Sequence, residues 1–141
     1  YYIFTFVRNP WSRLHSLYNY MRRVGSNKYF HSNSFNKWVS VVCDKTKNKE
    51  NVTHLTGFSP SQVYFLKNKQ NNLDSLDFIG KFENFKQDFL VIDEKFNFTK
   101  KNALLNIAPE PQDYTNVYNS ESKKKVAQAF QEDIDCFGYK F

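Results

Sequence analysis

The chain has 141 residues, a length typical of one domain, and 40% of them are hydrophobic and 18% aromatic, which argues against a disordered chain. Its 20 Lys and Arg residues against 14 Asp and Glu residues give a net charge of +6. This charge suits an anionic partner, such as nucleic acid, a polyanionic glycan or a phosphorylated small molecule, and equally a basic soluble protein without one. No apolar run reaches the roughly 18 residues of a membrane-spanning helix, so no such helix is predicted.

The first two predicted elements are a strand and a helix. Residues 2–7 form an aromatic, β-branched run, which predicts a strand buried on both faces with Arg8 at its carboxyl end. Asn9 can cap the helix that follows, Pro10 fits its first position, and Gly25 is predicted to end it. The helix carries one apolar stripe, made of Trp11, Leu14, Tyr18 and Met21.

The middle of the chain has shorter predicted elements. Residues 35–42 should form a short helix or a buried turn, with Ser34 as a possible cap before it. The polar residues 44–56 should form an exposed loop. A short segment at residues 61–66 precedes a solvated turn, and residues 76–80 are predicted to form a second strand.

Two helices are predicted in the last part of the chain. The first begins at residue 83 or 84 and runs to residue 96, with Phe85, Phe89 and Ile92 on one face. Residues 97–117 have no clear period and are predicted to form a loop.

The last helix is predicted to begin at Asn119 or Ser120 and to end at Gly138. Its apolar positions are Val126, Phe130, Ile134 and Phe137. Strands that alternate with helices indicate an α/β fold with a central parallel sheet flanked by helices, in a single domain over residues 1–141.

Arg8 lies where the first strand meets a helix, at the sheet edge where α/β proteins bind ligands. A helix N-terminus and a guanidinium fork together suit a phosphate, and Ser12 and Ser16 offer hydroxyl groups one turn apart on the polar face. The alternative is structural, with Arg8 paired to a carboxylate and the serines serving as small residues on a packed helix. The residues alone leave both interpretations open.

The sequence FVRNPWSRLHSLYNY (residues 6–20) resembles the 3′-phosphate-binding segment of the carbohydrate sulfotransferases, the family that includes the chondroitin and heparan sulfate 2-O-sulfotransferases. That segment has the pattern Arg-x-Pro, a second Arg three residues later, then Ser and Tyr. The matching residues here are Arg8, Pro10, Arg13, Ser16 and Tyr18. The resemblance implies a partial three-layer, P-loop-like fold, and it assigns Arg8 and Ser16 to the 3′-phosphate of 3′-phosphoadenosine 5′-phosphosulfate (PAPS).

Other segments resemble the same family in the same order. FIGKFENFKQDF (residues 78–89) is similar to its Val/Ile-Gly-Arg/Lys-Phe-Glu-Asn segment, and FQEDIDCFGYKF (residues 130–141) to its Asp-x-x-x-Phe-Gly-Tyr ending. SPSQVYFL (residues 59–66) is similar to a Pro-Gln segment in which Gln62 fits but Ser61 replaces the proline. No substrate contact is assigned to that segment.

The resemblance implies in-line transfer of a sulfuryl group from PAPS, as co-substrate, to a hydroxyl of a carbohydrate acceptor, without a metal. In the family, a lysine-containing loop that binds the transferred group lies upstream of the first matched segment. We expect this loop to be missing from the 141 residues, which alone would then be inactive. The alternative is a truncated, non-catalytic relative that binds a polyanionic glycan or a partner protein.

A nucleic-acid-binding domain ranks last among the hypotheses, because most aromatic residues fall on apolar stripes rather than among exposed basic residues. The compartment stays open between a microbial cytoplasm, which the composition favours weakly, and the Golgi lumen of animal relatives.

The general base, a His or Glu in the family, is left unassigned. Glu83 fits a structural carboxylate better than a base, with Lys81, Arg13 or a helix N-terminus as its partner. His15 lies on the helix of the predicted phosphate site, where a catalytic role is the less favoured interpretation. Surface or ordinary roles are predicted for His31, His54, Lys100, Lys101, residues 123–125 and the two thiols, Cys43 and Cys136, which have neither metal-ligand spacing nor a disulfide framework.

Overall fold

A computed structural model describes residues 1–24, 34–47, 61–97 and 113–141. The elements in chain order are β1 (Phe4–Val7), α1 (Pro10–Val24), α3 (Phe35–Lys47), α5 (Gln62–Leu66), β2 (Phe78–Lys81), the 3₁₀ turn η1 (Phe82–Asn84), α6 (Phe85–Phe96), α7 (Ser120–Ala129) and α8 (Gln131–Phe137). Among the described residues, no helix is both long and apolar enough to cross a bilayer.

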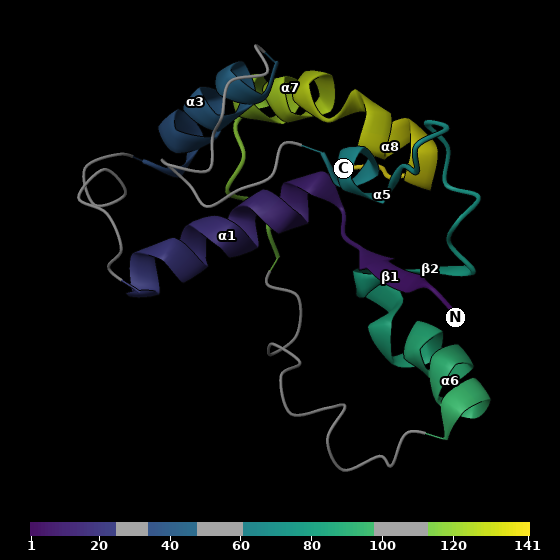
Figure 1. Cartoon of the computed structure of the whole chain (residues 1–141). Coiled ribbons are helices and arrows are strands. Elements are labelled where there is room, and N and C mark those ends of the chain that lie inside the picture. The colour runs from purple at the N-terminus through teal and green to yellow at the C-terminus, as the bar shows by residue number, and fades with distance from the viewer. Residues whose placement is uncertain (25–33, 48–60, 98–112) are drawn as a thin grey trace.

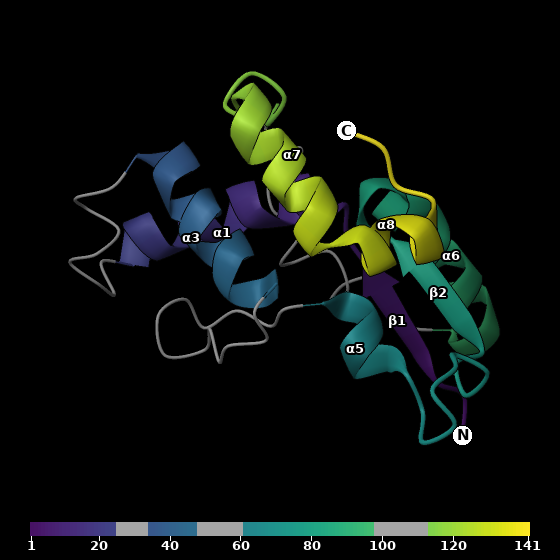
Figure 2. The ribbon, with the colours of Figure 1, turned by 90° about the horizontal axis from the view of Figure 1, so that it is seen from above.

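The sheet is a parallel pair of strands, β1 and β2, that runs in register from Phe4 opposite Phe78 to Val7 opposite Lys81. Helix α6 covers one face of the pair, and α5 and α8 lie over the other (Figures 1 and 2). The side chains alternate accordingly, because Phe6 packs on Phe85 of α6 whereas Val7 joins a cluster with α5 and α8. The predicted α/β fold, with a small parallel sheet flanked by helices, is confirmed.

The prediction that the first strand is buried on both faces is wrong. Val7 is buried, but Phe4 is 39% exposed and Ile3 47% exposed. Burial increases along β1 toward Val7 because Val7 is the residue of the strand that packs in the cluster with α5 and α8. The strand also begins later than predicted, although Ile3 still donates its N–H to the Asp77 carboxylate and accepts from the Asp77 N–H.

A second cluster of buried side chains fills the space between α1, α3 and α7. The predicted stripe of α1 is confirmed, since Trp11, Leu14 and Tyr18 are buried and Met21 packs at the edge of the cluster. Helix α3 packs most extensively on α7, and the two lie side by side in both views (Figures 1 and 2). The predicted end of α1 at Gly25 lies outside the described residues.

Helix α3 is longer than the sequence predicted. Residues 44–47, which were predicted to belong to an exposed loop, continue the helix to Lys47, and Thr46 is buried. The reason is that Val39, Val42 and Thr46 continue one helical face toward the cluster, so the polar composition of the last turn does not end it. Residues 48–56 of the predicted loop lie outside the described part of the chain.

The predicted last helix is two helices. Asn119 caps α7, as predicted, by accepting the N–H of Ser122, but the chain bends at Phe130, where φ is −116° and ψ is 27°. The bend lets Phe130 join the cluster of α1 and α3 while Phe137 joins the cluster of the sheet, and Ile134 packs against both. Gly138 ends α8 in the left-handed region, with φ 64°.

Three more predicted elements agree with the structure, whereas residues 98–112 of the loop predicted over residues 97–117 lie outside the described part of the chain. The segment after Ser61 is helix α5, and the second strand and the helix after it are β2 and α6. In α6, Phe85 and Phe89 stack with ring centroids 5.5 Å apart, and Ile92 is fully buried. The two thiols are free, as predicted, and the structure shows that Cys43 is buried and Cys136 exposed.

Candidate functional site

Arg8 follows β1 and Glu83 follows β2, so both lie at the carboxyl edge of the parallel pair. The backbone at Arg8 is held from both sides by one side chain. Its N–H donates to Oε1 of Gln62 at 2.8 Å, and Nε2 of Gln62 donates to its carbonyl oxygen at 2.8 Å. Helix α5 therefore fixes the peptide at the point where the chain leaves the sheet.

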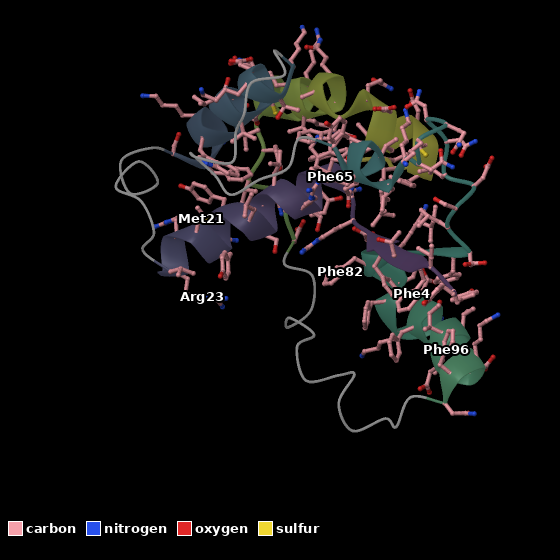
Figure 3. The ribbon with its side chains drawn as sticks, viewed as in Figure 1. Phe4, Met21, Arg23, Phe65, Phe82 and Phe96 are labelled. Carbon is pink, nitrogen blue, oxygen red and sulfur yellow. The ribbon has the colours of Figure 1, made fainter. Side chains whose placement is uncertain are left out.

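The guanidinium of Arg8 is held by α1 and by the turn after β2. Its Nε donates to Oγ of Ser12 at 3.0 Å, and its Cζ lies 4.5 Å from the ring centroid of Phe82, which Figure 3 labels at the beginning of α6. Burial lowers the pKa of this guanidinium, the charge of Glu83 opposes the shift, and an arginine remains cationic. The hydrogen bond of this guanidinium within the described ranges is made by Nε and not by its two terminal nitrogens.

Asn9 caps α1, as predicted, and connects it to two other segments. Its Oδ1 accepts the N–H of Trp11 at 3.1 Å, its N–H donates to Oε1 of Glu83 at 2.8 Å, and its Nδ2 donates to the carbonyl of Lys140 at 2.8 Å. The N–H groups of Asn9 and Trp11 are thus bonded within the chain. The expectation that the Asn9-Pro10 turn adds backbone donors for an anion is not supported at these two groups, because Glu83 and Asn9 itself accept from them.

Glu83 has the structural role that the sequence favoured, with a helix N-terminus as its partner. Besides the N–H of Asn9, its Oε2 accepts a long hydrogen bond of 3.4 Å from the hydroxyl of Tyr139. Burial, and then the charge of Glu83, raise the pKa of the Tyr139 phenol, so this hydroxyl is a neutral donor. The carboxylate therefore ties β2 to the beginning of α1 and to the chain after α8.

Ser12 and Ser16 lie on the same face of α1, one turn apart, as the spacing predicted. Ser12 is buried and accepts from Arg8, whereas Ser16 is half-buried and farther along the helix. The structure brings Ser12 to the guanidinium and leaves Ser16 one turn beyond it.

His15 is half-buried on α1 near this cluster. Its Nε2 lies 3.0 Å from Nδ2 of Asn19, and its ring meets the ring of Phe35 edge to face. Burial lowers the pKa of His15, the charge of Arg8 lowers it further, and Asp113 opposes the shift. The imidazole is therefore neutral at pH 7, and its contacts are those of a packed side chain.

Asp133, the aspartate of the Asp-x-x-x-Phe-Gly-Tyr ending, is a residue of the site to which the sequence assigned no role. Its side chain is fully buried in α8, and Oδ1 accepts from the hydroxyl of Ser61 at 2.6 Å and from the N–H of Val63 at 2.9 Å. Its Oδ2 accepts the N–H of Gln62 at 3.0 Å. Ser61, where the resembling segment has a proline, is the N-cap of α5 and accepts the N–H of Tyr64. A single aspartate in a helix gives no sequence signal for such contacts, because its partners lie far along the chain.

The segments that resembled one family in the sequence meet at this place. Arg8 comes from the first, Gln62 from the second, Glu83 from the third, and Asp133 and Tyr139 from the last. Four separate parts of the chain thus build one network around the turn between β1 and α1.

Other predicted residues lie elsewhere. Two lysines of residues 123–125 are not simply solvated, because Nζ of Lys125 lies 3.1 Å from the Asp44 carboxylate and Nζ of Lys123 lies 3.7 Å from the ring centroid of Phe141. The described ranges contain no group of His, Cys, Asp and Glu that could hold a metal. The predictions for His31, His54, Lys100 and Lys101 concern residues that lie outside those ranges.

Comparison with protein families gives a match to the model of the sulfotransferase family over residues 1–140. Comparison with curated proteins and with solved structures gives no match.

Proposed function

The chain belongs to the sulfotransferase family, and from this premise we propose that it takes part in PAPS-dependent transfer of a sulfuryl group to a hydroxyl of a carbohydrate acceptor. In that reaction the acceptor oxygen bonds to sulfur and the bond from sulfur to the bridging oxygen breaks. The electron pair of the broken bond stays on the 5′-phosphate, and a general base takes the acceptor proton. We assign no residue of this chain to the base.

Arg8 and Ser16 are the proposed binding residues for the 3′-phosphate of the nucleotide. The observation that carries the proposal is the state of the Arg8 guanidinium, which is half-buried at the carboxyl edge of the sheet and held at Nε by Ser12 and on its face by Phe82. A cation fixed in this way loses little side-chain entropy when it binds a phosphate bidentately. Ser16, one turn beyond Ser12, would add a hydroxyl donor.

Binding of the 3′-phosphate orients the nucleotide but does not stabilise the charge that develops at the 5′ end. The residues of this site thus contribute positioning rather than electrostatic stabilisation of the leaving group. Glu83 is already committed to the N–H of Asn9 and to Tyr139, which supports a structural role for it in the proposed reaction.

The test is a titration of the purified chain with adenosine 3′,5′-bisphosphate and with adenosine 5′-monophosphate, measured by calorimetry. The native chain should prefer the bisphosphate. Arg8→Ala should weaken bisphosphate binding by about 10- to 100-fold and remove the preference, since a hydrogen bond to a charged group contributes about 1.5–3 kcal/mol. Ser16→Ala should weaken it by roughly 3- to 10-fold.

The matched control is Arg23→Ala. Arg23 is exposed at the other end of α1, with its guanidinium 5.8 Å from the ring of Tyr20, and Figure 3 labels it far from Phe82. Its replacement should leave both affinities unchanged. Equal affinity of the native chain for the two nucleotides would refute the nucleotide part of the proposal, and a preference that survives Arg8→Ala would refute the assignment of Arg8.

A further inference from the structure

We infer that Gln62 is a positioning residue for Arg8, and that the segment from Ser61 serves the phosphate site by holding its backbone rather than by contacting substrate. This inference rests on the proposed function of Arg8. The resemblance of that segment to a Pro-Gln segment left its role open, and the contacts of Gln62 supply one.

The side-chain amide of Gln62 takes the place of a strand partner. The last backbone pair of the sheet is Val7 with Lys81, and Arg8 is the next residue of the chain. There the amide of Gln62 accepts the Arg8 N–H and donates to the Arg8 carbonyl, both at 2.8 Å. Two hydrogen bonds to one residue fix the peptide units on both of its sides, as a neighbouring strand would.

The amide orientation of Gln62 follows from its partners. The N–H of Arg8 can only donate, so it must meet the oxygen of the amide, and the carbonyl of Arg8 can only accept, so it must meet the nitrogen. With the amide reversed, the NH₂ group of Gln62 would face the N–H of Arg8, and its oxygen would face the carbonyl oxygen of Arg8.

Gln62 is itself held in place by a buried carboxylate. Its backbone N–H donates to Oδ2 of Asp133 at 3.0 Å, and its Nε2 lies 3.4 Å from the same oxygen. Asp133 has no exposed surface, and its charge acts on the buried guanidinium of Arg13. A glutamine anchored on a buried, hydrogen-bonded carboxylate keeps one rotamer, which is what a positioning residue needs.

The position of the Arg8 guanidinium depends on this backbone. A small rotation of the peptide is amplified along the side chain and would move Nε away from Ser12 and the guanidinium face away from Phe82. Loss of the Gln62 amide should therefore weaken 3′-phosphate binding although Gln62 does not touch the phosphate.

The test replaces Gln62 by methionine, which has a similar shape but cannot make the two hydrogen bonds. Gln62→Met should weaken the binding of adenosine 3′,5′-bisphosphate by about tenfold and that of adenosine 5′-monophosphate by less than about twofold. The control is Gln131→Met, an exposed glutamine of α8 that hydrogen-bonds Asp135 and should leave both affinities unchanged. In an Arg8→Ala background, Gln62→Met should have no further effect on nucleotide selectivity.

A second readout, without nucleotide, is hydrogen exchange at the Arg8 amide measured by NMR. Exchange should be faster in Gln62→Met than in Gln131→Met. Equal weakening of both nucleotides, or a loss of selectivity that persists in the Arg8→Ala background, would overturn the positioning role. If the native chain does not distinguish the two nucleotides, the proposed function fails. In that case the exchange rate of the Arg8 amide alone tests whether Gln62 holds this backbone. Faster exchange in Gln62→Met supports the contact, and unchanged exchange overturns it.

Discussion

Glu83 and Asp133 are two carboxylates that accept backbone hydrogen bonds at the beginning of a helix from another part of the chain. Glu83 accepts from Asn9 at the beginning of α1, and Asp133 accepts from Gln62 and Val63 at the beginning of α5. The first N–H groups of a helix lack intrahelical partners and carry partial positive charge, so a carboxylate satisfies both. Each contact also fixes the distance between two segments, which is how single residues align the turn that carries Arg8.

Cys43 provides a pH prediction at the residue scale. Burial, and then the charge of Asp44, raise the pKa of its thiol from 9.0 to about 12. Below pH 9 the thiol is protonated in both the folded and the unfolded chain, so its ionisation does not lower the free energy of unfolding. Above pH 9 the unfolded chain releases the proton first, so the free energy of unfolding should fall by about 1.4 kcal/mol per pH unit from this group, up to about pH 12.

Urea titrations between pH 9 and 11 measure this slope. Cys43→Ala should give a shallower fall than the native chain, even though the cavity lowers its stability at every pH. Cys136→Ala, at an exposed thiol, should change the slope less. Parallel curves for the native chain and Cys43→Ala would show that the thiol ionises equally in both states.

At the scale of elements, β2 carries a glycine where α6 and β1 leave no room for a side chain. A Cβ on Gly80 would lie 2.5 Å from Cε1 of Phe6 and 3.1 Å from Cε1 of Phe78. The ring of Phe6 is itself packed against Phe85, with centroids 4.8 Å apart, so it cannot move aside freely. The close approach of the aromatic face requires the glycine.

Gly80→Ala should lower the free energy of unfolding by about 1–3 kcal/mol, since overpacking forces neighbouring side chains off their rotamers. The same substitution should cost much less in a Phe6→Ala background, because the clashing ring is gone. Urea denaturation of the four proteins of this cycle gives the coupling. A cost of Gly80→Ala that is equal in both backgrounds would place its origin in the backbone rather than in the ring.

The elements differ in how far the sequence alone predicts them. Helix α1 was predicted with its cap, its first residue and its stripe, because all three depend on neighbouring residues. The bend at Phe130 and the last turn of α3 were not, because each depends on which cluster a side chain joins, and this is decided by residues far along the chain.

The site divides in the same way. Arg8 was identified by its place between a strand and a helix, which local pattern gives. Its two hydrogen bonds with Gln62 join residues 54 positions apart, and those of Asp133 with Gln62 join residues 71 apart. No period or spacing in the sequence encodes such pairs, so the structure was needed to find them.

At the scale of the whole molecule, the last residues of the chain return to the beginning of α1. Asn9 donates to the carbonyl of Lys140, and the ring of Phe141 lies 5.6, 5.7 and 5.8 Å, centroid to centroid, from the rings of Trp11, Tyr114 and Tyr118. These contacts join the helical cluster to the turn that carries Arg8. The network around Arg8 is therefore part of the global fold rather than a local motif.

Phe141→Ala tests this connection. Loss of the half-buried ring removes three edge-to-face contacts and apolar burial, and should lower the free energy of unfolding by about 2 kcal/mol. The control is Phe65→Ala, since Phe65 is 61% exposed and should cost less than about 1 kcal/mol. Urea denaturation measures both. Because Asn9 is anchored on the neighbouring Lys140, Phe141→Ala should also weaken adenosine 3′,5′-bisphosphate binding more than Phe65→Ala does; if both variants unfold and bind alike, the chain after α8 does not support the site.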